Sequence, residues 1–132
     1  MPSWFLIVYL KDREKSAREG RRVLGGIMAF VEFADVSKIY QMGEVEVAAV
    51  RDMSFTIEQG EFVVIVGPSG AGKTTLLNML GGMDSATSGT IMLDGARVSS
   101  FSRKQLTQYR RHDIGFVFQF YNLVQNLTAR EN

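Results

Sequence analysis

The chain has 132 residues, of which 45% are hydrophobic and 22% charged, and its formal net charge is +1. This composition is typical of one globular domain, and the near-neutral charge, without a basic stripe carrying interleaved aromatics, gives no reason to expect nucleic acid as a partner. Because the chain has no cysteine and a single histidine, His112, disulfide bonds, thiolate zinc sites and histidine metal clusters are excluded.

Residues 1–28 differ in character from the rest of the chain. An apolar piece, residues 4–10, is much shorter than the roughly 20 residues that a membrane span needs. Six basic and three acidic residues follow between Lys11 and Arg22. One interpretation is a short helix lying on anionic lipid. We favour a poorly ordered extension, translated from upstream of a true start at Met28, in front of a domain that covers residues 29–132.

The next part of the chain predicts a layer of short antiparallel strands. β-branched and aromatic residues gather at 30–36, 45–50 and 54–57, and the links between them are too short for parallel crossovers. Tyr40 is expected in the loop between the first two strands. It is either an ordinary packing tyrosine or an aromatic plate on which a purine base stacks.

A glycine-rich loop is the most informative stretch of the sequence. Residues 62–66 are an unbroken apolar run, as in a parallel strand buried on both faces, and residues 73–80 are compatible with a helix. Between them the chain fits the pattern Gly-x-x-x-x-Gly-Lys-Ser/Thr, in which backbone N–H groups and the positive helix end surround phosphate. The residues of the predicted phosphate site are Gly67, Pro68, Ser69, Gly70, Ala71, Gly72, Lys73, Thr74 and Thr75.

Three side chains of this loop have distinct predicted roles. Lys73 is expected to reach the outer phosphates, and the Thr74 hydroxyl to bind Mg²⁺, which keeps water and substrate oxygens as its other ligands. Thr75 is in position to donate to an inner phosphate. A glycine turn without a ligand is the alternative, and the flanking strand and helix patterns argue against it.

The remaining elements follow from local signals. Gly81 and Gly82 should end the helix, and residues 90–93 should form a strand closed by the turn pair Asp94-Gly95. Asp94 resembles the carboxylate of a second Mg²⁺ site, but no Glu follows it, so we interpret it as a turn residue. Residues 102–105 have capping-box spacing and should begin a helix that runs through residue 111.

The last apolar run, residues 114–118, predicts another strand with Gln119 at its end. Polar residues at this position of an α/β sheet often contact ligands, and an amide oxygen can bind Mg²⁺ or a water molecule. An ordinary polar residue at a strand end is the alternative. Residues 128–131 again have capping-box spacing, which predicts a further helix.

From about residue 31 to residue 132 the sequence resembles the first half of an ATP-binding cassette ATPase subunit. Residues 36–40 are similar to the family's adenine-stacking segment, 67–75 to its Walker A loop and 114–119 to the strand that ends in the Q-loop glutamine. Segments 80–84, 110–111, 120–123 and 127–132 are most similar to the branch that handles lipoprotein release, macrolide efflux and cell division. The implied fold is an α/β P-loop NTPase with an antiparallel β layer beside a partial RecA-like core.

The resemblance also implies a site and partners. ATP and Mg²⁺ are the implied cofactors, with Tyr40 stacking on adenine, Lys73 and Gln119 in catalytic roles, and Thr74 and Gln119 as metal ligands. The implied partners are a second ATPase subunit, in a homodimer or its equivalent, and membrane-spanning transporter subunits. Such an ATPase is cytoplasmic and lies on the inner face of the cell membrane.

The family's signature loop, its Walker B strand ending in Asp-Glu and its switch histidine do not occur in these 132 residues. We therefore expect this chain to hold nucleotide without hydrolysing it alone, and to be marginally stable, since the family's missing strands lie beside residues 62–66. A truncated fragment that binds ATP or docks on a partner is the alternative function. A kinase or GTPase is disfavoured by Tyr40 and Gln119. In transporters of the resembled family, substrate selectivity belongs largely to the membrane subunits.

Overall fold

The computed structural model describes residues 7–10, 29–118 and 124–131. In chain order the elements are β1 (Ile7–Leu10), β2 (Val31–Met42), β3 (Val45–Ile57), α1 (Lys73–Leu80), β4 (Ser88–Leu93), β5 (Ala96–Arg97), the 3₁₀ helix η2 (Val98–Ser100), α2 (Arg103–His112) and β6 (Ile114–Val117). Within this part of the chain no helix is long and apolar enough to cross a membrane.

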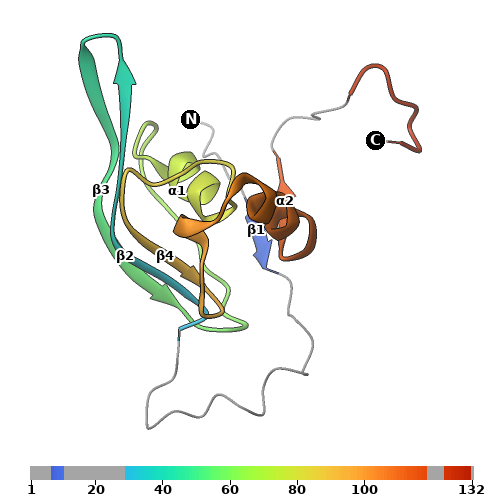
Figure 1. Cartoon of the computed structure of the whole chain (residues 1–132), viewed down its shortest axis with the longest axis horizontal. Helices are drawn as coiled ribbons and strands as arrows, with labels where there is room; N and C mark the ends of the chain where they lie inside the picture. The colour runs from blue at the N-terminus through green and yellow to red at the C-terminus, as the bar shows by residue number, and fades with distance from the viewer. Residues whose placement is uncertain (1–6, 11–28, 119–123, 132) are drawn as a thin grey trace, which may run out of the picture.

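The largest element is a four-stranded antiparallel sheet with the order β3-β2-β4-β5 (Figure 1). It confirms the predicted antiparallel layer. Two details of the prediction are wrong, because the second and third predicted strands are one strand, β3, and Tyr40 lies inside β2, paired with Val47. The chain reverses in two residues at Gly43, which has φ 65°, and Asp52 continues β3 through an irregularity at φ 46° instead of ending it.

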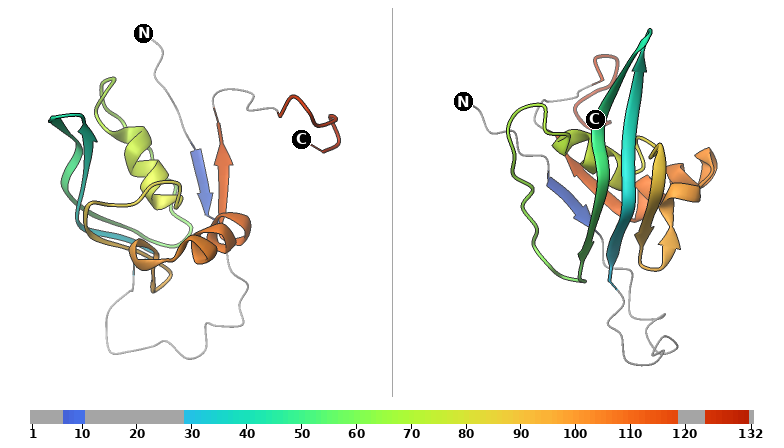
Figure 2. Two further views of the ribbon diagram at one scale, coloured as in Figure 1. Left: turned by 45° about the horizontal axis from the view of Figure 1, so that its top comes forward. Right: turned by 90° about the vertical axis from the view of Figure 1, so that its left-hand side faces the viewer.

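The core lies on the side of the sheet that faces α1. Figure 2 shows α1 between the β2–β3 hairpin and the β1–β6 ribbon. Burial alternates at the start of β2 and shifts phase at its register irregularity. The largest fully buried side chains come from β2, α1 and β4: Val31, Phe33, Val36, Met79 and Ile91. This packing fixes the position of α1, and therefore of the loop before it.

The predicted buried strand at residues 62–66 does not form. Residues 61–68 have no regular secondary structure, and Phe62 and Val66 are both 82% exposed. A parallel strand needs hydrogen-bonded neighbours, and none of the described strands pairs with this segment. Its apolar side chains at residues 62–64 and 66 are therefore exposed, whereas Ile65 packs against the core.

The predicted strand at the end of the chain is confirmed as β6, but its partner was not predicted. β6 pairs antiparallel with β1, so that Ile7 lies opposite Val117 and Leu10 opposite Ile114. These four residues belong to the amino-terminal extension, whose poor order stays a prediction. The other residues of 1–28 lie outside the described residues.

The turns and caps agree closely with the sequence signals. Asp94 and Gly95 have φ 47° and 73° and connect β4 to β5, as expected of a two-residue hairpin turn. Ser102 and Gln105 form the predicted capping box of α2. The amide and the hydroxyl of Thr128 donate to the Glu131 carboxylate at 2.9 and 2.7 Å. Residues 129–131 form a turn, so the helix predicted there is not seen within the described residues.

Candidate functional site

The glycine-rich loop connects the irregular segment 61–68 to α1. Gly70 and Gly72 both have φ 80°, a left-handed conformation that glycine adopts without strain. Gly72 is the N-cap of α1 and provides no side chain to bond the first-turn amides. The helix therefore begins with backbone donors that are not occupied by a capping side chain, as a phosphate site requires.

Gly72 is also required by packing. A Cβ atom at this position would lie 2.2 Å from the carbonyl oxygen of Ala49 and 3.2 Å from a methyl carbon of Val50, both in β3. At Gly70, by contrast, an added Cβ would meet nothing within 4 Å. The loop is thus fixed against the sheet at Gly72 and open at Gly70.

Lys73 folds back over the loop. Its ammonium group donates to the carbonyl oxygens of Gly67 and Pro68, both at 2.7 Å. A lysine ammonium has three N–H donors, so these two contacts leave one for a further acceptor. The side chain is thereby held at the centre of the predicted phosphate loop.

The two threonines that follow Lys73 differ in their surroundings. Thr74 is exposed, whereas Thr75 is half-buried. The Thr75 hydroxyl lies close to the Tyr40 phenol and acts to lower the pKa of Tyr40. The described residues contain no group of three or more His, Cys, Asp or Glu side chains that could hold a metal. A metal at the Thr74 hydroxyl would therefore take its other ligands from water and substrate oxygens, which fits the usual coordination of Mg²⁺.

Tyr40 belongs to a three-residue cluster with Lys38 and Asp84. The Tyr40 hydroxyl donates to one carboxylate oxygen of Asp84 at 2.6 Å, and the Lys38 ammonium donates to the other at 2.6 Å. Lys38 also donates to the carbonyl oxygen of Ser85 at 2.7 Å, and its nitrogen lies 4.9 Å from the centre of the Tyr40 ring. We refer to Lys38, Tyr40 and Asp84 as the tyrosine cluster.

The charges of the tyrosine cluster shift its ionisation equilibria. The hydrogen bond to the Asp84 carboxylate, together with burial, raises the pKa of Tyr40, and the Thr75 hydroxyl opposes this shift. Partial burial acts to raise the pKa of Asp84, but the hydrogen bonds from Lys38, Tyr40 and the Ser85 amide outweigh it and hold that pKa below its ordinary value. Near neutral pH, a phenol that donates therefore faces a carboxylate that accepts.

Helix α2 and strand β6 hold the end of α1. The buried hydroxyl of Tyr109 donates to the carbonyl oxygen of Leu80 at 2.6 Å, and the Arg110 guanidinium donates to that of Gly82 at 2.6 Å. Burial, with the nearby Asp113 carboxylate, raises the pKa of Tyr109. A Cβ at Gly81 would lie 2.0 Å from the Phe116 ring, so β6 also packs against this helix end.

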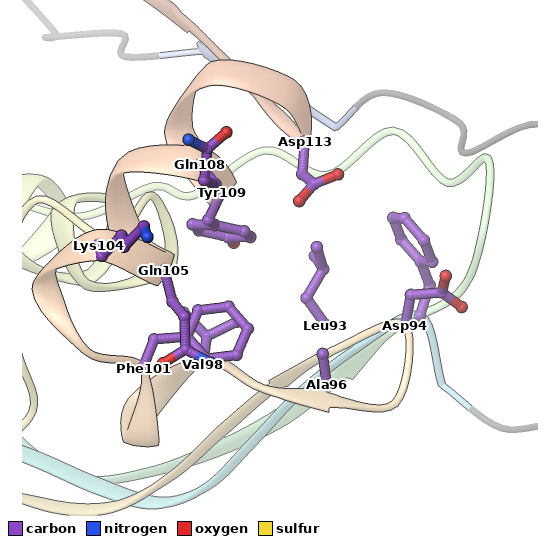
Figure 3. A pocket seen from close by; sticks show the side chains of 11 residues that line it. Leu93, Asp94, Ala96, Val98, Phe101, Lys104, Gln105, Gln108, Tyr109 and Asp113 are labelled. Carbon is purple, nitrogen blue, oxygen red and sulfur yellow. The ribbon is translucent and has the colours of Figure 1, made fainter.

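A separate cavity of about 300 Å³ lies between the β4–β5 hairpin and α2. Figure 3 shows Leu93, Val98 and Phe101 on one side, with Tyr109 and Asp113 of the α2 region opposite. None of residues 67–75 lines it. It is therefore not part of the predicted phosphate site.

The structure brings Tyr40 close to Thr75, but it does not test the position of Gln119, which lies outside the described residues. Sequence reasoning missed Lys38 and Asp84 as members of the site. The spacing of Lys38 and Tyr40 along a strand could have suggested a shared face. Asp84 is 44 residues from Tyr40, and no local pattern indicates their contact.

Comparisons with known proteins agree with the geometry of the loop. A family model described as ABC transporter matches residues 50–132. An uncharacterized ABC transporter ATP-binding protein of Thermotoga maritima is 51% identical over 102 residues, which are 77% of this chain and 44% of that protein. The macrolide export ATP-binding/permease protein MacB of Neisseria gonorrhoeae is 42% identical over 105 residues, which are 80% of this chain and 16% of that protein.

Solved structures give the same result. One is a dimeric structure of the bacterial ABC transporter cassette MJ0796; a protein of that name belongs to Methanocaldococcus jannaschii. Its sequence is 42% identical and the TM-score is 0.73, and the match covers 76% of this chain and 44% of the chain in that structure. A second structure, of MJ0796 bound to ADP and Pi, has a TM-score of 0.71 at 43% identity, and the match covers 74% of this chain and 42% of the chain in that structure. The predicted fold class is confirmed, and this chain spans less than half the length of these relatives.

Proposed function

This chain belongs to the ABC transporter family, and from that premise we propose that residues 67–75 bind the phosphates of ATP together with Mg²⁺. The observation that carries the proposal is the position of Lys73, whose ammonium is held over the loop by two carbonyl oxygens at 2.7 Å. A cation fixed beside backbone donors and a helix N-terminus is an arrangement suited to a polyphosphate.

Each part of the loop has a proposed task. The amides of residues 69, 70 and 72–74 surround the inner phosphates, because Gly70 and Gly72 allow the backbone to turn its N–H groups to one side, whereas the amide of Ala71 donates to the Pro68 carbonyl oxygen at 3.2 Å. Lys73 contacts the outer phosphates with its remaining donor. The hydroxyl of Thr74 binds Mg²⁺, and that of Thr75 donates to an inner phosphate. When bound, Mg²⁺ neutralises phosphate charge and orients the outer phosphate.

Two proposed contacts lie outside the loop. The half-buried ring of Tyr40, in β2, is the plate on which the adenine base stacks. Its link to the loop through Thr75 supports this assignment, since base and phosphates of one nucleotide must be reached together. Gln119 is proposed as a Mg²⁺ ligand and as the residue that communicates nucleotide binding to a partner.

For the whole protein, we propose ATP hydrolysis that drives a membrane transporter or a mechanical membrane machine. The relatives include a dimeric cassette and an ATP-binding/permease protein, which supports a second ATPase subunit and membrane-spanning subunits as partners. Such an assembly would place this domain in the cytoplasm at the inner face of the membrane. We propose that this chain belongs to the branch of the family that includes macrolide export.

The proposal is tested by titrating the chain with ATP and Mg²⁺ in a calorimeter. We expect saturable binding, weakened at least tenfold by Lys73→Ala, because the only side-chain cation in residues 67–75 is lost. Lys104→Ala, on the exposed face of α2, is the matched control and should bind as the wild type. Absence of binding at millimolar ATP, or equal affinity in Lys73→Ala, would contradict the proposal.

The same preparation tests the expected lack of turnover. Phosphate release from ATP by the 132-residue chain should not exceed that of Lys73→Ala, because residues 67–75 contain no carboxylate that could polarise a water molecule. Release that disappears on Lys73→Ala would show that the chain alone is an ATPase.

A further inference from the structure

The tyrosine cluster is held more firmly than a base-stacking residue alone requires. Tyr40 and Lys38 come from β2, whereas Asp84 lies in the turn that follows α1, 44 residues away from Tyr40. One carboxylate oxygen accepts from the Lys38 ammonium at 2.6 Å and from the Ser85 amide at 2.7 Å, and the other accepts from the Tyr40 hydroxyl at 2.6 Å. The phenol therefore donates to a carboxylate that is itself held by two other donors, and a charge-assisted hydrogen bond of this kind is stronger than a neutral one.

The turn that carries Asp84 is itself fixed to α1. The amides of Met83 and Asp84 both donate to the carbonyl oxygen of Asn78, at 2.8 and 3.1 Å. Gly82, with φ 67°, makes this close return possible. The helix that begins at the phosphate loop therefore also determines where Asp84 lies.

Lys38 restricts the ring in a second way. Its ammonium lies 4.9 Å from the centre of the Tyr40 ring, a distance typical of a cation over an aromatic face. The Lys38 side chain is only 11% exposed and that of Asp84 24%, so water screens these charges less than at the surface. The Lys38 ammonium thus lies over one face of the ring.

From this geometry we propose that Lys38 and Asp84 are positioning residues that hold the Tyr40 ring for the purine base, which stacks on the face opposite Lys38. The inference rests on the proposed function of residues 67–75. The new element is that affinity for the base depends on the Asp84 carboxylate and the Lys38 ammonium, although these groups contact neither the base nor the phosphates.

If Lys38 and Asp84 only stabilised the fold, their loss would weaken binding of every ligand equally. Comparing two ligands therefore distinguishes a positioning role from a purely structural one. ATP and inorganic tripolyphosphate share the phosphate contacts, but only ATP has a base. We expect Asp84→Asn to weaken ATP binding by about fivefold to tenfold, a part of the effect of losing a stacked base, and to leave tripolyphosphate binding unchanged. Asp94→Asn, in the exposed hairpin turn, is the matched control and should change neither.

The direction of the expected change in ATP affinity distinguishes it from a general electrostatic effect. Asp84→Asn removes a negative charge, so general electrostatics alone predicts tighter binding of both anions. A loss confined to ATP opposes that trend. Tyr40→Phe, which keeps the ring and loses the hydroxyl, should weaken ATP binding as Asp84→Asn does, and the double variant should lose no more than either single one.

Lys38 is tested by exchange and rescue. Lys38→Met should weaken ATP binding more than tripolyphosphate binding, and Lys38→Arg should restore most of the difference, since a guanidinium can stack on the ring and pair with Asp84. Lys104→Met is the matched loss of one positive charge. Fluorescence of an etheno-adenine analogue of ATP gives an independent measure of stacking and should report less stacking in both Lys38→Met and Asp84→Asn.

Two sets of results would overturn the proposal. Equal weakening of ATP and tripolyphosphate by Asp84→Asn would show that the cluster supports the loop or the fold. Unchanged ATP binding and fluorescence in Asp84→Asn and Lys38→Met would show that the ring needs no support. If the wild type bound neither ligand at millimolar concentration, the proposed function itself would fail, which is a distinct outcome.

Discussion

A Cβ atom on Gly72 would lie 2.2 Å from the carbonyl oxygen of Ala49, so the phosphate loop and strand β3 are in direct backbone contact. Gly70, two residues earlier, has the same φ of 80° and open space around it. Gly70 is therefore required only by its backbone conformation, whereas Gly72 is required both by its conformation and by its packing against Ala49.

This difference predicts the effect of adding one methyl group. Gly70→Ala should cost about 1 to 2 kcal/mol of unfolding free energy, because alanine is strained at positive φ. Gly72→Ala meets the same strain and displaces the Ala49 carbonyl, so its loss should be larger by about 1 to 3 kcal/mol. Urea denaturation of both variants measures the difference, and equal losses would mean that the loop is not packed on β3 as described.

The hydroxyl of Tyr109 provides a second prediction. Tyr109→Phe keeps the buried ring but removes the donor to the Leu80 carbonyl, and we expect a loss of about 1 to 3 kcal/mol in unfolding free energy. Thr107→Ala, which removes an exposed hydroxyl from the same helix, should cost less than about 0.5 kcal/mol. Thermal and urea unfolding would check this, and a Tyr109→Phe variant as stable as the wild type would contradict the described contact.

The pH dependence of stability should reveal the Asp84 carboxylate. Its pKa is lower in the folded chain than in the unfolded one, so its contribution is present above the ordinary aspartate pKa of about 3.9 and is lost as the pH falls through the lower folded value. The groups that face it are Lys38, Tyr40 and the Ser85 amide, and Tyr40, with its raised pKa, stays neutral in this range.

Asp84→Asn should therefore be less stable than the wild type by about 2 kcal/mol at pH 7, and this difference should shrink below about pH 4. Urea midpoints at a series of pH values measure it. A difference that stayed constant from pH 7 to pH 3 would show that the carboxylate's charge has no part in the cluster.

The uncovered segment 61–68 predicts association of the isolated chain. Phe62 and Val66 are 82% exposed, so Phe62→Ser with Val66→Thr should change unfolding free energy by less than about 0.5 kcal/mol and reduce light scattering. Phe33→Ser, at a fully buried position, is the contrasting variant and should cost about 3 to 5 kcal/mol. A large loss in the double variant would show that this segment is buried in solution.

The sequence predicted best the features that depend on neighbouring residues. The capping box of Ser102 and Gln105, the turn at Asp94 and the end of α1 at Gly81 each follow from a few adjacent side chains. The antiparallel layer was also predictable, because the links between the runs of β-branched and aromatic residues are too short for parallel crossovers. Family resemblance added an interpretation of Tyr40 that its periodicity alone left open.

Other features depend on partners that no local pattern contains. Residues 62–66 have the composition of a buried strand, but a strand forms only where another strand pairs with it. The Lys38–Asp84 contact joins residues 46 positions apart, and the β1–β6 pairing joins opposite ends of the chain. The turn at Gly43 lacks the usual Asn-Gly or Asp-Gly pair, which is why β2 and β3 were predicted too short.

Binding of nucleotide phosphates by residues 67–75 is tested by recording amide chemical shifts of the isotopically labelled chain while ATP and Mg²⁺ are added. We expect saturable changes that are largest at Gly70, Gly72 and Lys73, where backbone N–H groups meet phosphate, and we expect these changes to be absent in Lys73→Ala. Saturable ATP binding with unchanged shifts throughout residues 67–75 would contradict this assignment, because the nucleotide would then bind elsewhere.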